Sequence, residues 1–416
     1  MSLRMSDSWR TARLGQIATI QTGIAKGKKP KKECVSVPYL RVANVQNGFL
    51  DLTEIKQIEV DPATVPRYLL RSGDVLFTED GDYDKLGRGT VWQGQIDPCL
   101  HQNHVFAVRP NAEILLPEFL AYVASSMAGR RYFTLCSKQS TNLASINSTQ
   151  LKQFPIPLPP LSEQQRIADI LSTWDRAIEQ AEKIIDHERR ACSSIFGHLY
   201  NQTRSIGATR GPNGWSRTTF REIFTEVREL NAHLGPKDVI TVGKYDIRKQ
   251  VEHFNRRVAS SDLSRYWVLS PGDFVYDPMS VYYGAIGRFQ SSSSGIVSPA
   301  YRVLRLRADI DPEFVLGLLT VYHIRFQFET RSTQGNREGK RRILQRPEFA
   351  RIEFYLPPLH VQKAISATAQ EVIQRRNKAP VRVDILKRQR DTIVSQLLNG
   401  RLSVIETKRL SHSAPK

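Results

Sequence analysis

Two clusters of basic side chains, each mixed with glycine, carry the most informative chemistry in this chain. The first occupies residues 25–32 and the second residues 331–346. Lysine and arginine neutralise phosphate groups, and glycine suits loops that approach a phosphate backbone closely. Arginine, asparagine and glutamine can form paired hydrogen bonds with base edges in the major groove of DNA. The clusters and the polar residues near them therefore predict two DNA-binding surfaces.

The predicted DNA contacts form two sets, one for each cluster. The first set is Lys26, Lys28, Lys29, Lys31, Arg130, Arg131, Lys138, Gln139 and Asn142. The second set is Arg325, Arg331, Asn336, Arg337, Lys340, Arg341 and Arg342. Tyr282 and Tyr283 could pack on a sugar or a base, but adjacent tyrosines in a β-rich region are at least as often half-buried.

Positive charge is in excess over the whole chain. Its 416 residues include 60 lysines and arginines against 41 acidic residues, a net charge of +19. Such a surplus attracts polyanions, so we expect double-stranded DNA as the partner, ahead of an anionic membrane or an acidic protein. The N-terminus lacks the apolar core of a secretory signal, and no apolar run reaches the roughly 18 residues of a membrane span.

The four cysteines lie far apart and form no Cys-x-x-Cys pair. This spacing predicts reduced thiols in the cytoplasm, and it predicts neither a disulfide framework nor a zinc site.

The residues that suggest catalysis form no convincing site. Residues 335–341 superficially resemble a phosphate loop, but the spacing is one residue short and an arginine replaces the serine or threonine. Asp80, Asp82 and Asp84 alternate in a turn and could bind a cation, which keeps a cryptic nuclease as one alternative. A polar surface loop is the simpler interpretation. We therefore predict a protein that binds and does not catalyse, with no cofactor or metal of its own.

Four short segments recur in the same order about 200 residues later. Residues 9–17 return at 215–223, residues 70–77 at 269–276, residues 117–119 at 312–314, and residues 157–161 at 355–359. Nearly constant offsets predict two homologous halves. Each half begins with short β-type runs separated by glycine turns, contains one helical stretch (about 117–132 and about 312–328), and ends in a proline-rich joint.

A long helix is predicted after each joint. Ser162 and Gln165 match a capping box at the start of the first helix. Its apolar seam is Ile167, Leu171, Trp174, Ile178, Ala181, Ile185, Glu188, Cys192, Ile195 and Leu199. The second seam is Val361, Ile365, Thr368, Val372, Arg375 and Ala379, interrupted near Pro380, then Leu386, Ile393 and Leu397. Spacings of three and four predict that the two helices pair with each other.

The joint identifies a family. Residues 158–167, Leu-Pro-Pro-Leu-Ser-Glu-Gln-Gln-Arg-Ile, closely resemble the joint of the specificity subunits of Type I restriction–modification systems, and residues 396–402 resemble that family's closing segment. The second joint departs from the pattern: Val361 replaces the glutamate and Lys363 the second glutamine, while Gln362 and Ile365 are retained.

The resemblance implies an α+β fold with two mixed target-recognition domains, each followed by a long helix, the helices pairing as an antiparallel coiled coil. The expected parts are residues 1–155 (first domain), 156–205 (first helix), 206–353 (second domain), 354–405 (second helix) and 406–416 (a basic, disordered tail).

The same resemblance implies a function. Each domain would read one half of a bipartite, asymmetric DNA target, and the helices would set the gap. Two methyltransferase subunits would bring S-adenosylmethionine, and two motor–nuclease subunits would bring ATP hydrolysis and Mg²⁺. The alternative is a free-standing DNA-binding or architectural protein with a coiled-coil spacer.

Overall fold

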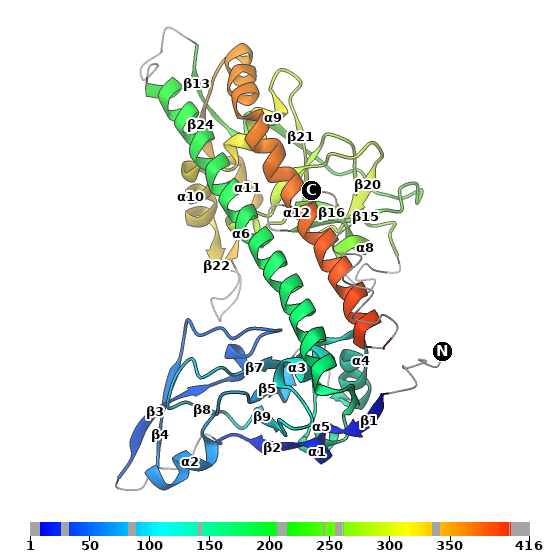
Figure 1. Cartoon of the computed structure of the whole chain (residues 1–416). Coiled ribbons are helices and arrows are strands. Elements are labelled where there is room, and N and C mark those ends of the chain that lie inside the picture. The colour runs from blue at the N-terminus through cyan, green and yellow to red at the C-terminus, as the bar shows by residue number, and fades with distance from the viewer. Residues whose placement is uncertain are drawn as a thin grey trace. The chain divides into compact units, whose positions relative to one another are not determined.

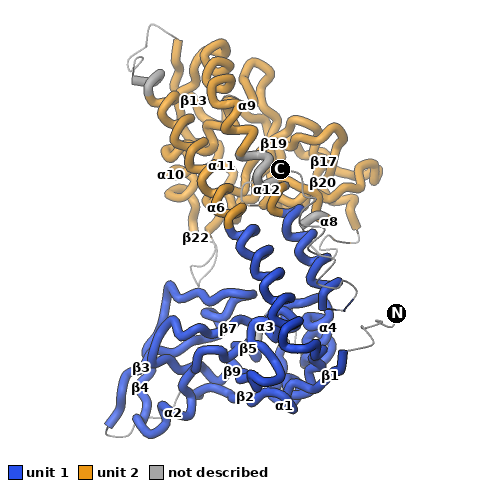
Figure 2. The backbone as a smooth tube through the Cα atoms, in the orientation of Figure 1, with its two compact units in different colours: residues 1–179, 384–416 blue, residues 180–383 orange. Residues whose placement is uncertain are grey.

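The computed structural model describes residues 9–25, 33–81, 89–139, 144–205, 214–243, 246–253, 260, 262–334, 342–398 and 400. The chain divides into two compact units, unit 1 (residues 1–179 and 384–416) and unit 2 (residues 180–383), as Figure 2 shows. The limits fall inside two long helices, α6 (Leu161–Ser205) and α12 (Leu359–Leu398), so each unit includes a part of both. No helix in the described ranges is long and apolar enough to cross a bilayer.

Unit 1 is a mixed α+β unit (Figure 1). Its strands are β1 (Arg10–Arg13), β2 (Ala18–Thr22), β3 (Val35–Leu40), β4 (Lys56–Val60), β5 (Val75–Thr78), β6 (Asp80–Gly81), β7 (Gly89–Val91), β8 (Leu100–His101), β9 (Val105–Pro110), β10 (Lys138–Gln139), β11 (Ala144–Ser145) and β12 (Pro155–Leu158). Its helices are α1 (Leu14–Ile17), η1 (Val42–Asn44), η2 (Pro62–Thr64), α2 (Val65–Tyr68), α3 (Pro117–Ser125), α4 (Met127–Cys136) and α5 (Ser148–Lys152), besides its parts of α6 and α12.

The antiparallel sheet β2-β9-β5-β7 is the centre of unit 1. A separate sheet has the strand order β4-β3-β8. Alternation along β5 explains why both faces of the central sheet are buried. Val75 and Phe77 join the core that includes α3, α4 and the ends of the long helices, whereas Leu76 joins a second core with Trp92.

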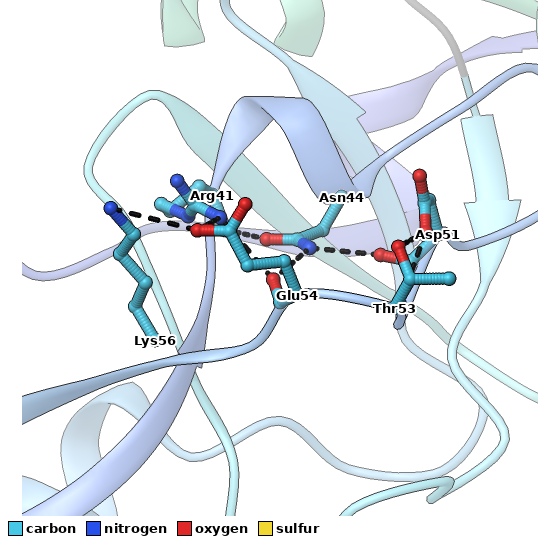
Figure 3. A network of polar contacts seen from close by, with 6 residues as sticks. All are labelled: Arg41, Asn44, Asp51, Thr53, Glu54 and Lys56. Atoms are coloured by element: carbon cyan, nitrogen blue, oxygen red, sulfur yellow. Dashed lines mark hydrogen bonds and ion pairs between the residues drawn. The ribbon is translucent and has the colours of Figure 1, made fainter.

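A polar network holds the connection between β3 and β4 (Figure 3). Asn44 is buried, accepts the backbone N–H of Arg41 at 2.9 Å, and donates to the carbonyl oxygens of Asp51 at 2.8 Å and Glu54 at 3.1 Å. Glu54 in turn lies 3.4 Å from the Arg41 guanidinium and 3.6 Å from the Lys56 ammonium. The Asn44 side chain thus satisfies one backbone N–H and two carbonyl oxygens of this connection.

Unit 2 repeats this order of elements. Its strands are β13 (Ser216–Thr219), β14 (Phe224–Val227), β15 (Val239–Gly243), β16 (Asp246–Lys249), β17 (Trp267–Leu269), β18 (Phe274–Tyr276), β19 (Ile286–Arg288), β20 (Gly295–Val297), β21 (Arg302–Leu306), β22 (Thr333–Gln334), β23 (Arg342–Ile343) and β24 (Glu353–Leu356). Its helices are α7 (Phe220–Ile223), α8 (Gln250–His253), η3 (Val281–Tyr283), α9 (Pro312–Leu318), α10 (Tyr322–Arg331) and α11 (Arg346–Ala350).

The sheet orders of unit 2 correspond to those of unit 1. The sheet β14-β21-β18-β19 matches β2-β9-β5-β7, and β16-β15-β20 matches β4-β3-β8, including the parallel pair β15–β20. The fold class predicted from the sequence is confirmed: two mixed halves, each followed by a long helix. The proposed domain limits and the coiled-coil pairing of the helices stay predictions.

One ion pair recurs at the same turn of both units. Arg109 holds the buried carboxylate of Asp74 through two bonds of 2.7 Å, and Arg305 holds Asp273 through bonds of 2.9 and 3.0 Å. The aspartates follow glycines, Gly73 and Gly272, which both have φ +90°. In each unit the Gly-Asp pair thus forms a glycine turn whose aspartate is bound by an arginine of a neighbouring strand in the sheet.

The predicted capping box is wrong. Helix α6 already begins at Leu161, so Ser162 lies inside the first turn, and Gln165 donates to Asp169 on the helix surface. The neighbouring Gln164 is the buried residue: it accepts the N–H of Leu116 at 2.9 Å and donates to the carbonyl oxygens of Ile114 and Pro159.

Gln362 repeats this anchor in unit 2. It accepts the N–H of Asp311 at 2.9 Å and donates to the Pro357 oxygen at 2.8 Å. The glutamine retained in both joints therefore ties each long helix to the residues that precede α3 or α9, where it satisfies a backbone donor.

The single helical stretch expected in each half is also wrong, because each is two helices. Ser126, with ψ 162°, ends α3, and its hydroxyl accepts the Gly129 N–H to start α4. A Cβ on Gly129 would lie 2.4 Å from the Ala124 carbonyl oxygen, so only glycine allows this close turn. Val321 makes the corresponding break between α9 and α10 with ψ 136°.

The long helices differ from the predicted seams at several positions. Helix α12 continues through Pro380, because a proline removes one backbone donor but a long helix keeps its other bonds. In α6 the buried residue is Phe196, whereas Ile195 is exposed. In α12 the predicted Thr368 and Arg375 are exposed, and Ala369 and Ile373 are buried.

Candidate nucleic-acid interface

Several strands of the central sheet of unit 1 begin or end at one edge, next in sequence to predicted DNA-binding segments. The pairs Thr22↔Phe106, Thr78↔Val105 and Phe77↔Gly89 place the ends of β2 and β5 and the starts of β9 and β7 at this edge. The chain therefore leaves the same edge toward residues 26–32, 82–88 and 101–104. The lysines Lys26, Lys28, Lys29 and Lys31, and Asp82 and Asp84, lie outside the described residues.

A small hairpin joins this edge. Strands β10 and β11 pair with each other, and β11 pairs with β6, so Ser145 lies opposite Asp80. The Ile146 N–H also donates to the Glu79 carbonyl oxygen at 3.0 Å. Lys138 and Gln139 form β10, which places these two predicted contacts at the sheet edge, and Asn142 lies outside the described residues.

Helix α4 leads into the hairpin and is fixed by aromatic packing. Phe133 lies 4.7 Å from Phe154 and 6.1 Å from Phe77, centroid to centroid, and the Tyr132 hydroxyl donates to the Gln150 carbonyl oxygen at 2.8 Å. With this face buried, Arg130 and Arg131 are exposed. The structure therefore brings together Arg130, Arg131, Lys138 and Gln139 on consecutive elements.

Two histidines lie beside the edge. His104 Nδ1 is 2.9 Å from Glu79 Oε2, which can supply an ion pair when the ring is protonated. His101 is fully buried, and its Nδ1–H donates to the Val105 oxygen at 2.7 Å, so Nε2 carries no proton and has no partner among the described atoms. Burial lowers the pKa of His101 and keeps its ring neutral.

Unit 2 builds the same arrangement from α10 and the hairpin β22–β23. Phe328 stacks on Phe349 at 6.2 Å, and Gln327 exchanges two bonds with the backbone of Glu353, of 2.8 and 3.0 Å. The Leu344 N–H donates to the Pro278 oxygen at 2.9 Å, as Ile146 does to Glu79 in unit 1. The helix and the hairpin thus occupy equivalent places in both units.

Two predicted cations of unit 2, Arg331 and Arg342, are already engaged in ion pairs. Arg331 lies 3.2 Å from Glu348, and Arg342 lies 3.4 Å from Glu329. Arg325 is half-buried, and Asn336, Arg337, Lys340 and Arg341 lie outside the described residues. Phosphate binding by Arg331 or Arg342 would require exchange of a carboxylate partner, whereas Arg130 and Arg131 are exposed to an incoming phosphate.

Exposed apolar residues at the interface were missed by the sequence interpretation. Met127 and Tyr322 begin α4 and α10, and their exposed fractions are 78% and 77%. Phe326 is also exposed and stacks on Tyr322 at 6.0 Å. Of the two tyrosines considered for base packing, Tyr282 packs on the core and Tyr283 is 36% exposed. No sequence signal separates such residues from core residues of the same helix.

No group of three metal-binding side chains occurs within the described ranges. Asp80 is the only member of the acidic turn that the structure describes, and its strand is engaged in the hairpin sheet.

The predicted partner-helix residues are placed as follows. Ile167, Leu171, Ile178, Ile185, Ile365 and Leu397 are buried, whereas Trp174, Val372, Leu386 and Ile393 are half-buried. A role of the half-buried residues in pairing of the two helices or in binding a partner protein stays a prediction.

Comparison with known proteins finds similarity to one family. Residues 6–187 match the family model of the Type I restriction modification DNA specificity domain. The putative type I restriction enzyme MjaX specificity subunit of Methanocaldococcus jannaschii is 29% identical over 198 residues, which cover 47% of this chain and 46% of that protein. The EcoBI specificity subunit of Escherichia coli is 23% identical over 439 residues, covering 96% and 88% of the two chains.

A solved structure, the Type-I restriction-modification system S subunit from M. genitalium, aligns over 95% of this chain and 99% of its own, with 14% identity and a TM-score of 0.49. The alignments with the first three curated relatives span 37–46% of the length of those proteins. The resemblance that the joint motif suggested is confirmed.

Proposed function

Residues 6–187 belong to the family of the Type I restriction modification DNA specificity domain, and from that premise we propose that this chain is the DNA sequence-recognition subunit of a Type I restriction–modification complex. The observation that carries the proposal is the duplication of one helix-and-hairpin arrangement, α4 with β10–β11 and α10 with β22–β23, in two units. Each unit would read one half of a bipartite, asymmetric target. The chain would be non-catalytic and cytoplasmic.

The physics of tethering supports two readers in one chain. Once one half-site is bound, the second binding step becomes intramolecular, so binding is tight only when both half-sites lie at the right separation. Half-sites about one helical turn apart, roughly 34–36 Å, present the same groove face. A helix of 40 or 45 residues is long enough to set such a span.

Repetition also supports the partner assignment. Two similar units offer two similar docking sites from one polypeptide, which suits two copies of a methyltransferase subunit. Those subunits would bind S-adenosylmethionine and methylate adenine, and two motor–nuclease subunits would supply ATP- and Mg²⁺-dependent cleavage.

The test is a methylome of cells that carry the locus, with the gene intact, deleted, or carrying residues 215–345 from a relative. We expect adenine methylation at one split motif, lost on deletion, with only one half of the motif changed by the exchange. Methylation that is unchanged on deletion would refute the proposal, and so would an exchange that alters both halves. Measuring DNA affinity with and without the methyltransferase would then test a free-standing DNA-binding protein.

A further inference from the structure

Three polar side chains from separate segments of unit 1 meet at the long helices. The Tyr122 hydroxyl on α3 donates to Asp175 Oδ2 at 2.9 Å, and Arg390 Nε on α12 donates to Asp175 Oδ1 at 2.8 Å. Asp175 lies in the part of α6 that belongs to unit 1, as Arg390 lies in the corresponding part of α12. Both carboxylate oxygens are therefore used, one by the domain and one by the last helix.

The arginine of this contact is largely shielded from solvent, whereas the aspartate is partly exposed. The Arg390 side chain is 17% exposed and that of Asp175 is 42% exposed. Leu171, Val394 and Leu397 belong to the apolar core of the same helices. Burial and the Asp175 charge raise the pKa of Tyr122, so its hydroxyl stays a donor.

An apolar seam alone specifies helix register weakly. When one helix slides by a turn, one apolar side chain replaces another at little cost, whereas a directional charged bond is lost. A single polar pair in such a seam can therefore select one register.

Unit 2 shows that the fold itself does not require this polar trio. By the repeat offsets, 198 residues for the helices and 195 for the α3 and α9 segments, Asp175 corresponds to Ile373, Arg390 to Cys192, and Tyr122 to Gly317. Ile373 and Cys192 are buried in an apolar core. The same elements are thus assembled in unit 2 without the three residue types of this trio.

We propose that Tyr122, Asp175 and Arg390 form a register clamp that fixes the end of α12 along the start of α6 and so narrows the gap that the chain accepts between its two half-sites. The inference rests on the proposed function. Gln362 ties the start of α12 to the backbone of unit 2, and the clamp ties its end to unit 1. With both of its ends anchored, α12 acts as a second rigid connection besides α6.

The test is the methylome of cells that express the complete system with the Arg390→Met variant. Methionine keeps the length and helix propensity of the arginine stem but removes the charge. We expect both half-site sequences to persist, while methylation at gaps that differ by one or two base pairs rises about tenfold or more. A slide of one helical turn, about 5.4 Å, corresponds to roughly one or two base pairs of 3.4 Å.

Three further variants sharpen the result. The exchange Asp175→Arg with Arg390→Asp should restore a single gap at least in part, because the ion pair is rebuilt with reversed polarity. Tyr122→Phe removes only the hydroxyl, keeps the ring in the core, and should broaden the gap less. Arg382→Met removes an exposed arginine from the same helix and should leave the gap unchanged.

An Arg390→Met variant that methylates the motif at the single wild-type gap would overturn the clamp. If the Arg390→Met variant does not accumulate in cells, Tyr122→Phe becomes the test of the clamp. Methylation by Tyr122→Phe at the single wild-type gap would likewise contradict the clamp. If the wild-type chain directs methylation to no split motif, the proposed function itself is refuted. If the motif is split but its gap is the same in the wild-type chain and in the clamp variants, only the clamp is refuted.

Discussion

Units 1 and 2 share their glutamine anchors and their aspartate–arginine pairs, and they differ in the packing of side chains on the long helices. Gln164 and Gln362 accept equivalent N–H groups, and Asp74 and Asp273 bind equivalent arginines. At the helices, unit 1 uses the Tyr122–Asp175–Arg390 contact, whereas unit 2 packs aromatic rings.

The aromatic packing of unit 2 depends on one glycine. Phe196 on α6 lies 5.6 Å from Phe314, and a Cβ on Gly317 would lie 2.1 Å from the Phe196 ring. Tyr200, one turn later, exchanges two bonds with the backbone of Tyr355, of 2.7 and 3.1 Å. The comparison indicates that contacts which satisfy backbone groups persist in a repeat, while side-chain packing can diverge as long as volume is filled.

The largest effect is expected from truncating the aromatic contact. Phe196→Ala should lower the stability of unit 2 by about 3–5 kcal/mol, because a fully buried ring is removed and its cavity cannot close. Val394→Ala, at the equivalent place in unit 1, should cost only about 2 kcal/mol. Native-state hydrogen exchange, read separately in the peptides of each unit, measures both losses. Equal losses would mean that the two units hold their helices in the same way.

A smaller effect is expected from the shared glutamine anchors. Gln164→Leu and Gln362→Leu should each cost about 1–3 kcal/mol, because the N–H of Leu116 or of Asp311 loses its partner. Exchange should speed up around residues 111–120 in the first variant and around residues 308–316 in the second. Gln165→Leu, the exposed neighbour, is the control and should change neither segment. If only one of the two glutamine substitutions had a large effect on stability, the two anchors would not be equivalent.

The smallest effect is expected from a buried histidine that unit 2 lacks. In the parallel strand pair, His101 lies opposite Leu40, and Val297 lies opposite Ile240. Burial lowers the folded-state pKa of His101, so the unfolded chain binds the proton more readily.

Stability should therefore be complete above the unfolded pKa of about 6.5 and fall as the pH drops below it, by at most about 1.4 kcal/mol per pH unit. Only unit 1 should lose stability through His101 at acid pH, and His101→Val should abolish this loss. Hydrogen exchange between pH 5 and 7, corrected for the intrinsic rate, is the measurement. An acid loss that persists in His101→Val must come from another group.

Much of the architecture could be predicted from local pattern. The recurrence of Gly-Asp, Pro-Glu-Phe and Leu-Pro-Pro-Leu at nearly constant offsets predicted two similar halves, and the spacing after Pro160 and Pro358 predicted two long helices. These features are local: proline joints, glycine turns and helical periodicity depend on residues close in sequence.

The candidate site was predictable only in part. The basic clusters at residues 25–32 and 331–346 and the polar candidates at residues 130–142 were visible in the sequence. The structure places Arg130, Arg131, Lys138 and Gln139 on consecutive elements. The pairing of Arg331 with Glu348 was not visible, because the partners are brought together by the packing of α10 near α11. The exposure of Tyr322 was equally hidden, since an aromatic residue in a helix has the same spacing whether it faces the core or solvent.

The sequence by itself determined the duplication, the basic charge, the proline joints and the existence of two long helices. Tertiary structure decided which helix face is buried. Phe196 and not Ile195 enters the core because Gly317 leaves room for its ring, and Gln164 and not Gln165 is the anchor because the Leu116 N–H needs an acceptor. Spacing defines a helix, but the surface that the helix meets defines its buried side, and that surface is built by residues far away in the chain.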